Sequence, residues 1–242
     1  MSWPFGDGQV SVLRRPGLVA GSADLDGVLA AARSADVSGP VILLSRCSPT
    51  AAFSRRDALL SGYSGAVAEC RSAGYEPVIR PVGGHLAAYD PGSVVVHLWN
   101  RHPDPRRDLR QRVAVAGAAL AAALGDLGVP DVRVGPVPGE YCDGEWSVNV
   151  AGRAKLVGTG QRLFRHGFLF SAVVMAESSG SVRDMLTSGY AALGLPLDPD
   201  TVDSVDRWVP GVEQGDVAET VAARLARALR DLMSLSVERT AV

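Results

Sequence analysis

Two residues whose types could take part in nucleophilic chemistry, Cys142 and Lys155, lie in the same stretch of the sequence. Lys155 is the only lysine, so arginines make up the rest of the 24 Lys and Arg residues. A lysine ammonium has a tunable pKa and its nitrogen can attack or hold a reacting group, whereas arginine stays charged. The single lysine therefore indicates a site that needs this side chain. A compositional bias that leaves one lysine by chance is the alternative interpretation.

Cys142 lies in the polar segment 139–146, whereas Cys47 and Cys70 lie beside apolar residues of a predicted strand and a predicted helix. A loop cysteine next to a cation can be held as a thiolate and act as a nucleophile. The neighbouring Asp143 and Glu145 work against this, because negative charge raises the pKa of a thiol. A free surface thiol is the alternative interpretation.

A glycine pair, Gly83 and Gly84, follows a predicted strand and begins a loop that continues to residue 92. Adjacent glycines allow backbone N–H groups to approach a ligand without interference from Cβ atoms, although an ordinary connection has the same composition. His85 in this loop could orient a substrate or cap a turn, and Asp90 is typical of a turn. The loop matches neither the P-loop pattern nor the dinucleotide-binding glycine pattern.

Arg46 and Arg80 stand at the ends of predicted strands, where they could anchor an anion or a carbonyl group; surface ion pairs are the alternative. His97 lies inside an apolar strand and is expected in the core. The three cysteines form no CxxC pair and have no histidine-rich neighbourhood, so the sequence predicts no metal site and no disulfide framework. No Ser-His-Asp order or G-x-S-x-G segment is present.

Hydrophobic periodicity predicts the elements that position these residues. Helices are expected at 24–35, 57–73, 108–127, 181–193 and 216–233, and strands at 9–13, 41–45, 50–54, 77–80, 93–99, 132–134, 146–150, 154–159 and 167–175. The second helix would begin at an Asp N-cap, and residues 195–210 would form a surface loop. The short spacings between strands predict an α/β (α+β) fold, with a central mixed, largely antiparallel sheet flanked by helices. We expect a single domain over residues 1–242.

Composition narrows the function classes. A chain of 242 residues with 47% hydrophobic residues can bury a full core, and its net charge of −2 favours neither nucleic acid nor an anionic membrane as a partner. The longest apolar run, 113–124, is too short to span a bilayer. The N-terminus has no secretory pattern, and the cysteine usage fits a reducing compartment, so we expect a cytoplasmic protein.

Three segments, taken in order, resemble the lipoate–protein ligase / octanoyltransferase family, whose catalytic fold is shared with biotin–protein ligases. Residues 40–56 resemble an early strand pair of the family, 80–92 its Arg-x-Ser-Gly-Gly loop, and 150–162 its Gly-x-Lys-hydrophobic-x-Gly-x-x-Gln-Arg motif. The resemblance covers about residues 20–195 and leaves 216–233 as a C-terminal helix. The run that contains Cys142 resembles the cysteine-dependent octanoyl-[GcvH]:protein octanoyltransferase branch.

This resemblance implies that Cys142 attacks an acyl amide or thioester and carries the acyl group as a thioester. Lys155 would hold the acyl carbonyl oxygen or the charge that develops on it. The residues it implies for substrate binding are Arg46, Arg80, Gly83, Gly84, His85, Asp90, Gly158, Thr159 and Gln161. The implied partners are lipoyl-domain proteins, namely the glycine-cleavage H protein and the E2 subunits of 2-oxoacid dehydrogenases. A transferase of this kind needs no cofactor.

Several residues depart from the family pattern. Val82 replaces the usual serine before the glycines, Pro81 replaces an arginine or polar residue, and His85 stands where ligases have a third glycine. An ATP-dependent lipoate–protein ligase, which would use ATP and Mg²⁺, is one alternative function. A non-catalytic acyl-binding relative is another.

Overall fold

The computed structural model describes residues 3–177, 180–209 and 216–240, with side chains in the last helix described as far as residue 234. The strands are β1 Ser11–Val19, β2 Val41–Cys47, β3 Thr50–Phe53, β4 Glu76–Ile79, β5 Ala87–Tyr89, β6 Ser93–Arg101, β7 Val132–Val134, β8 Val148–Val150, β9 Ala154–Phe164 and β10 Gly167–Met175. The helices are α1 Gly21–Arg33, α2 Tyr63–Ser72, α3 Leu109–Asp126, α4 Gly180–Leu193 and α5 Val217–Thr240.

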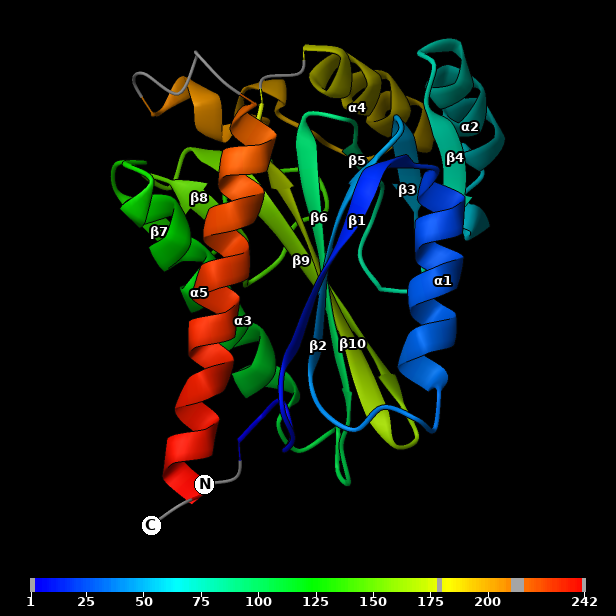
Figure 1. The fold of residues 1–242 in the computed structure, drawn as a ribbon. Coiled ribbons are helices and arrows are strands. Elements are labelled where there is room, and N and C mark those ends of the chain that lie inside the picture. The colour runs from blue at the N-terminus through cyan, green and yellow to red at the C-terminus, as the bar shows by residue number, and fades with distance from the viewer. Residues whose placement is uncertain (1–2, 178–179, 210–215, 241–242) are drawn as a thin grey trace.

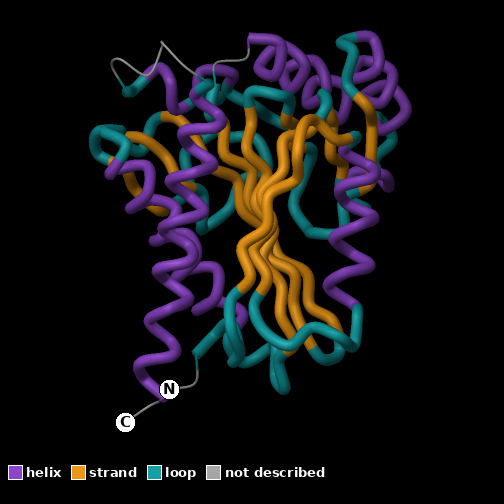
Figure 2. The backbone as a smooth tube through the Cα atoms, viewed as in Figure 1, coloured by secondary structure: helices purple, strands orange, loops and turns teal. Residues whose placement is uncertain are grey.

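A seven-stranded sheet in the order β1-β2-β6-β10-β9-β8-β7 forms the centre of the molecule (Figure 2). Only β1 and β2 pair in parallel, and the other neighbours are antiparallel. The mixed, largely antiparallel sheet predicted from the sequence is therefore confirmed. A second sheet has the order β4-β3-β5.

Helices cover both faces of the large sheet, with α3 and α5 on one side and α1 on the other (Figure 1). Because side chains alternate along a strand, Phe168 and Phe170 of β10 join the core below α3 and α5, whereas Leu169 packs toward α1. Burial on both faces explains the nearly continuous apolar run of this strand. Helices α2 and α4 pack together beside the small sheet, around Phe53 and Leu186.

The predicted helix 57–73 is wrong at its beginning. The structure has a single 3₁₀ turn at Asp57–Leu59 and then α2, whose N-cap is Gly62. The Asp57 carboxylate accepts a hydrogen bond from the backbone N–H of Ser54, so it faces back toward β3 rather than forward along a helix. Asp57 therefore does not cap α2.

Two other expectations need correction. The segment treated as a loop from Arg80 to residue 92 contains β5, which pairs with β3. The expected surface loop 195–210 includes 3₁₀ turns at Pro199–Thr201 and Val205–Arg207, and Val202 and Val205 are buried. Residue 210 lies outside the described residues.

A β-bulge between β8 and β9 sets the direction of Lys155. The pairing shifts between Val148, opposite Val157, and Asn149, opposite Lys155. As a result both Leu156 and Val157 join the core below α3 and α5, while Lys155 lies on the side of Gly158. Bulges of this kind commonly redirect a side chain at a functional site.

Candidate active site

Cys142 lies in the loop between β7 and β8 and has a positive φ of 44°. This backbone conformation is unfavourable for a residue with a Cβ atom and persists only where surrounding contacts hold it. The backbone N–H of Cys142 donates to the Tyr190 hydroxyl of α4 at 2.5 Å, and that hydroxyl donates to the Leu86 carbonyl at 2.9 Å. Strained backbone of this kind clusters at active sites, ligand clamps and switch regions.

Two donors from the glycine loop meet at the sulfur of Cys142. Arg80 Nη2 lies 3.1 Å from Sγ, and the backbone N–H of His85 lies 3.3 Å from it. The same Arg80 nitrogen donates to the His85 carbonyl oxygen at 2.6 Å, which fixes the loop around the thiol. A Cβ atom on Gly84, which has φ +99°, would lie only 2.4 Å from Sγ. The glycine therefore provides the space that the thiol occupies.

These contacts determine the ionisation of Cys142. Burial raises the pKa of the thiol, but the charges of Arg80 and Lys155 and the hydrogen bonds from His85 and Arg80 more than offset it, and the pKa lies below the ordinary value of 9.0. Burial has the opposite result at the other two cysteines, where it raises the pKa of Cys47 to about 12 and that of Cys70 to about 11. Of the three thiols, that of Cys142 is therefore the most readily ionised.

Lys155 is fully buried, and its ammonium fastens the loop that carries Cys142. Nζ donates to the carbonyl oxygens of Tyr141 at 2.9 Å and Cys142 at 3.0 Å, and it lies 3.4 Å from Oε2 of buried Glu140. Burial lowers the pKa of Lys155 below its ordinary value, and the Glu140 carboxylate opposes part of that decrease. The arrangement sets a positive charge beside the thiolate without direct contact with the sulfur.

His85 has a second partner, the buried carboxylate of Asp57. His85 Nδ1 lies 2.7 Å from Asp57 Oδ1, and the histidine side chain keeps 16% of its surface exposed while that of Asp57 has none. An imidazole held by a carboxylate has a fixed orientation and tautomer. The site therefore combines a thiol, two cations and an oriented histidine.

The other residues implied by the resemblance lie beside the site, on the opposite face of β9, or at the turn after β5. Gly158 adjoins Lys155, since a Cβ atom there would lie 3.3 Å from Lys155 Cε, and Gly83 is exposed in the same loop as Gly84. Thr159 donates to the Trp146 carbonyl, and Gln161 Nε2 donates to the Leu109 carbonyl at the start of α3. Those two side chains therefore point to the opposite face of β9.

Arg46 and Asp90 support the fold near the turn after β5. Arg46 donates to the Pro91 carbonyl oxygen and pairs with Asp216 before α5. Asp90 accepts the N–H of Gly92 at 2.9 Å, so it forms a turn, as its sequence context indicates. These contacts tie the β5–β6 turn to the C-terminal helix.

The sequence analysis does not single out Asp57, Glu140 and Tyr190 as residues of the site. Glu140 offered a signal, because it stands two residues before Cys142 in the same polar run. Asp57 and Tyr190 offered none, since they come from segments far away in the chain and look like a helix cap and a core aromatic residue. Only the packing of α4 and of the turn after β3 brings them to the thiol.

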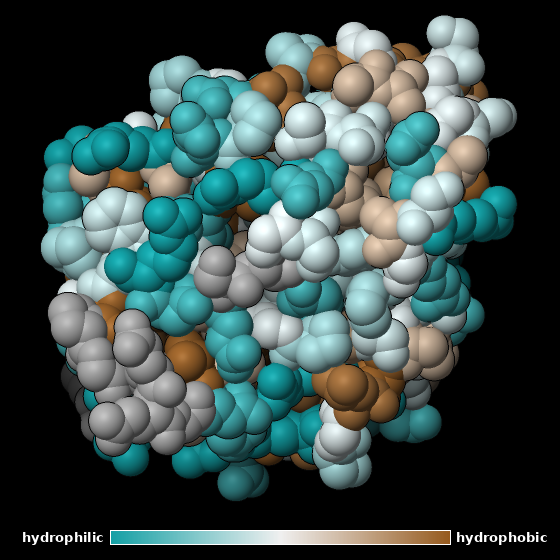
Figure 3. All heavy atoms as spheres, turned by 90° about the horizontal axis from the view of Figure 1, so that it is seen from above, coloured by the Kyte–Doolittle hydropathy of each residue, from teal (hydrophilic) through white to brown (hydrophobic). Residues whose placement is uncertain are grey.

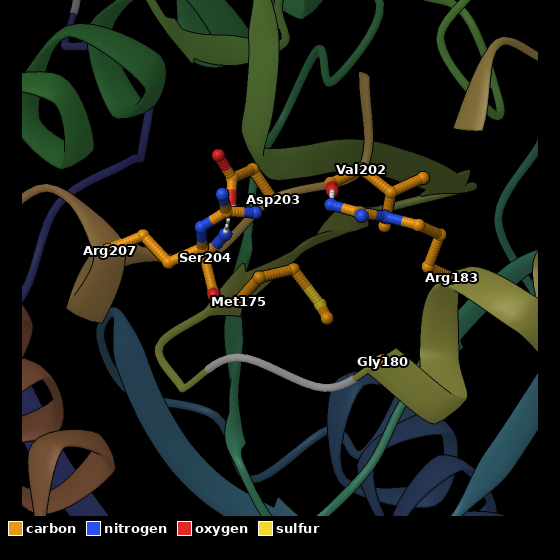
Figure 4. Close-up of a pocket in the computed structure, with 7 residues that line it drawn as sticks. All are labelled: Met175, Gly180, Arg183, Val202, Asp203, Ser204 and Arg207. Carbon is orange, nitrogen blue, oxygen red and sulfur yellow. Dashed lines mark hydrogen bonds and ion pairs between the residues drawn. The ribbon is translucent and has the colours of Figure 1, made fainter. Parts of the chain in front are cut away.

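A small cavity of about 50 Å³ lies between the end of β10, the start of α4 and residues 202–207 (Figure 4). Arg183 crosses it to donate to the Val202 carbonyl at 2.8 Å, and Arg207 pairs with Asp203. Binding pockets for small ligands usually measure about 300–1,000 Å³, so this cavity is too small for an acyl chain. Neither Cys142 nor Lys155 lines it.

In the described part of the chain, no group of three or more His, Cys, Asp or Glu side chains is arranged to hold a metal ion. No helix there has the length and apolar character needed to cross a membrane. The end of the molecule seen in Figure 3 carries mostly hydrophilic and neutral side chains, with hydrophobic ones in small groups.

Comparisons with known proteins place the chain in a family. The Lipoyl protein ligase A/B catalytic domain family matches residues 20–225, and the chain belongs to it. An octanoyl-[GcvH]:protein N-octanoyltransferase of Geobacillus kaustophilus is 26% identical over 170 residues, covering 70% of this chain and 59% of that protein. A protein with the same name from Exiguobacterium sibiricum is 26% identical over 198 residues, covering 76% of this chain and 68% of that protein. The match thus spans under two thirds of the Geobacillus relative.

Solved structures with the same fold include a lipoate-protein ligase A bound with ATP, with a TM-score of 0.71 and 17% identity over 95% of this chain and 86% of that one. A bi-partite lipoate protein ligase from Thermoplasma acidophilum has a TM-score of 0.68 and 16% identity over 93% and 84% of the two chains. The resemblance found in the sequence is confirmed, as is the lipoyl ligase type of catalytic fold.

Proposed function

We propose that this chain is an acyltransferase that moves an octanoyl or lipoyl group onto the lysine of lipoyl domains through a thioester on Cys142. The observation that supports it most is the enclosure of a strained thiol by Arg80, Gly84 and His85, which lowers the pKa of that thiol. The names of the relatives support an octanoyl group and a GcvH donor.

In the first half-reaction the Cys142 thiolate attacks the acyl carbonyl carbon of the donor. A C–S bond forms, the bond from that carbon to the donor nitrogen or sulfur breaks, and the leaving amine takes up a proton. Arg80 and the His85 N–H, which hold the thiolate in the free enzyme, are then available to the oxygen that becomes negative in the transition state. Lys155 contributes its charge through the loop that it fastens.

In the second half-reaction the amine of the acceptor lysine attacks the thioester. A C–N bond forms, the C–S bond breaks, the thiolate returns and the amine loses a proton. This balance needs neither ATP nor a metal ion, so we propose a reaction without a cofactor. We further propose the glycine-cleavage H protein as donor, E2 lipoyl domains as acceptors and the cytoplasm as the location.

The test is a transfer assay without nucleotide. Octanoylated H protein and an unmodified lipoyl domain are incubated with the enzyme, and both carriers are followed by intact mass. We expect the octanoyl group to move to the lipoyl domain, and Cys142→Ser to abolish the movement. Acylation only when ATP and free octanoate are supplied would instead indicate a ligase, and no acylation in either case would indicate a non-catalytic acyl-binding protein.

A further inference from the structure

Acyl exchange between two lysine amines needs a group that both gives and takes a proton, and this requirement follows from the proposed function. An amine leaves an acyl carbon readily only when protonated, and the acceptor amine must lose a proton as it attacks. General acid–base catalysis by a placed side chain typically contributes about 10²–10⁴-fold to such steps. Among the described residues around Cys142, the candidates for proton transfer are Arg80, Lys155 and His85.

The two cations next to Cys142 are poorly suited to this task. The Arg80 guanidinium does not release a proton at physiological pH. Lys155 donates hydrogen bonds to the carbonyl oxygens of Tyr141 and Cys142, and its ammonium forms an ion pair with the Glu140 carboxylate. Proton release from Lys155 would also loosen the loop that carries the nucleophile.

His85 meets the requirement. Its backbone N–H contacts Sγ at 3.3 Å, so the residue borders the reacting atom. Its Nδ1 faces the buried Asp57 carboxylate at 2.7 Å, and because a carboxylate only accepts hydrogen bonds, Nδ1 carries the proton there. Nε2 is then the nitrogen that gains and loses a proton, and it lies on the side of the ring away from Asp57. The His85 side chain keeps 16% of its surface exposed, whereas that of Asp57 is fully buried.

We propose that His85, oriented by Asp57, is the proton carrier of the transfer reaction. Nε2–H donates its proton to the donor amine as the C–N bond of the donor breaks and the C–S bond to Cys142 forms. Nε2 then accepts a proton from the acceptor amine as the new C–N bond forms and the C–S bond breaks. His85 is in the same state before and after one turnover, and Asp57 acts as a positioning residue through it.

The alternative is that the Asp57–His85 pair only fastens the glycine loop to the turn after β3. Both roles predict a loss of activity in His85→Ala, so activity alone does not separate them. They differ in their dependence on the leaving group. An aryl ester such as p-nitrophenyl octanoate releases a phenolate that needs no proton, whereas octanoylated H protein releases an amine that does.

The experiment measures single-turnover acylation of Cys142 by these two donors in the wild type, His85→Ala and Asp57→Asn. His166→Ala, a change at an exposed histidine outside the site, is the matched control. We expect both active-site variants to react with the aryl ester within a few-fold of the wild type and with the amide about 10²–10⁴-fold more slowly. Asp57→Asn should show this pattern because an amide nitrogen facing Nδ1 favours the wrong tautomer. Added imidazole should restore part of the amide reaction in His85→Ala.

Other outcomes would overturn the proposal. An equal loss with both donors and no rescue by imidazole would assign His85 a purely structural role. Wild-type rates with both donors would exclude any role in proton transfer. A wild-type enzyme that neither donor acylates would overturn the proposed function itself, so the two failures are distinguishable.

Discussion

The substitution Gly84→Ala tests the geometry of the nucleophile, with Gly83→Ala as a comparison in the same loop. A Cβ atom at Gly84 would lie 2.4 Å from Cys142 Sγ and 2.8 Å from Arg80 Nη2. At Gly83 a Cβ atom would meet nothing within 4 Å, and the φ of Gly83 lies outside the left-handed region. The two variants therefore add the same methyl group to adjacent residues, and only one of them reaches the thiol.

The size of the effect follows from these distances. Since non-bonded atoms prefer separations of about 3.5–4.0 Å, the sulfur or the loop must move by more than about 1 Å in Gly84→Ala. A displacement of about 1 Å at a reacting group can reduce the rate about 100-fold, which corresponds to about 2.7 kcal/mol in the activation free energy. The φ of +99° adds a destabilisation of about 1–3 kcal/mol for a residue with a Cβ atom.

The assay is the single-turnover rate of acyl-enzyme formation from octanoylated H protein, followed by intact mass, with Tm measured on the same samples. We expect Gly84→Ala to lose about 100-fold in rate, and Gly83→Ala to lose less than about tenfold. A Gly84→Ala rate within threefold of the wild type would refute the proposed thiol geometry. Equal losses in the two variants would also refute it, because loop flexibility rather than the contact with Sγ would then set the rate.

Three further predictions concern ionisation. Burial raises the pKa of Cys142, and the charge of Arg80 does most to lower it. Arg80→Met should therefore raise the pKa of Cys142 and move the pH profile of iodoacetamide alkylation to higher pH. An unchanged profile would contradict the effect of Arg80 on the thiol. Cys47 and Cys70, whose pKa values are raised to about 12 and about 11, should stay unreacted near neutral pH. Burial raises the pKa of Asp24, but the contacts with His97, Ser45 and Arg15 have the larger effect. The pKa of Asp24 therefore lies below the ordinary value of 3.8. The stability from this network is therefore present above the unfolded-state pKa and lost as pH falls through the folded-state pKa. Asp24→Asn should lower the free energy of unfolding at pH 7 by about 3 kcal/mol, and urea titrations at pH 7 that show no change would contradict this.

The sequence predicted the secondary elements where periodicity is strong. Helices α3 and α4 and strands β7 and β10 lie within a residue or two of their expected bounds, because apolar repeats dominate these segments. Hydrophobic patterns do not reveal contacts between distant polar residues. Asp24 lies beside the apolar stripe of α1, and only the folded chain shows its buried partner His97 on β6.

Local motifs indicated the candidate site residues, but only the fold shows how these residues are arranged. The alternation of side chains explains why Thr159 and Gln161 leave the site: Gly158 faces Lys155 on one side of β9, so the odd-numbered neighbours after the bulge face the other. The acidic neighbours of Cys142 in the sequence predicted a raised thiol pKa. Arg80, which is distant in the sequence and 3.1 Å away in space, reverses the direction.

In the proposed reaction the thiol of Cys142 carries the acyl group. The most direct measurement incubates the protein with octanoylated H protein in the absence of ATP, then maps the adduct by peptide mass and tests its removal by hydroxylamine. We expect a hydroxylamine-sensitive octanoyl group on the peptide that contains Cys142 and none on the Cys142→Ser variant. An enzyme that transfers the group to a lipoyl domain equally well after Cys142→Ser, or that carries it on another residue, would contradict the proposed thioester mechanism.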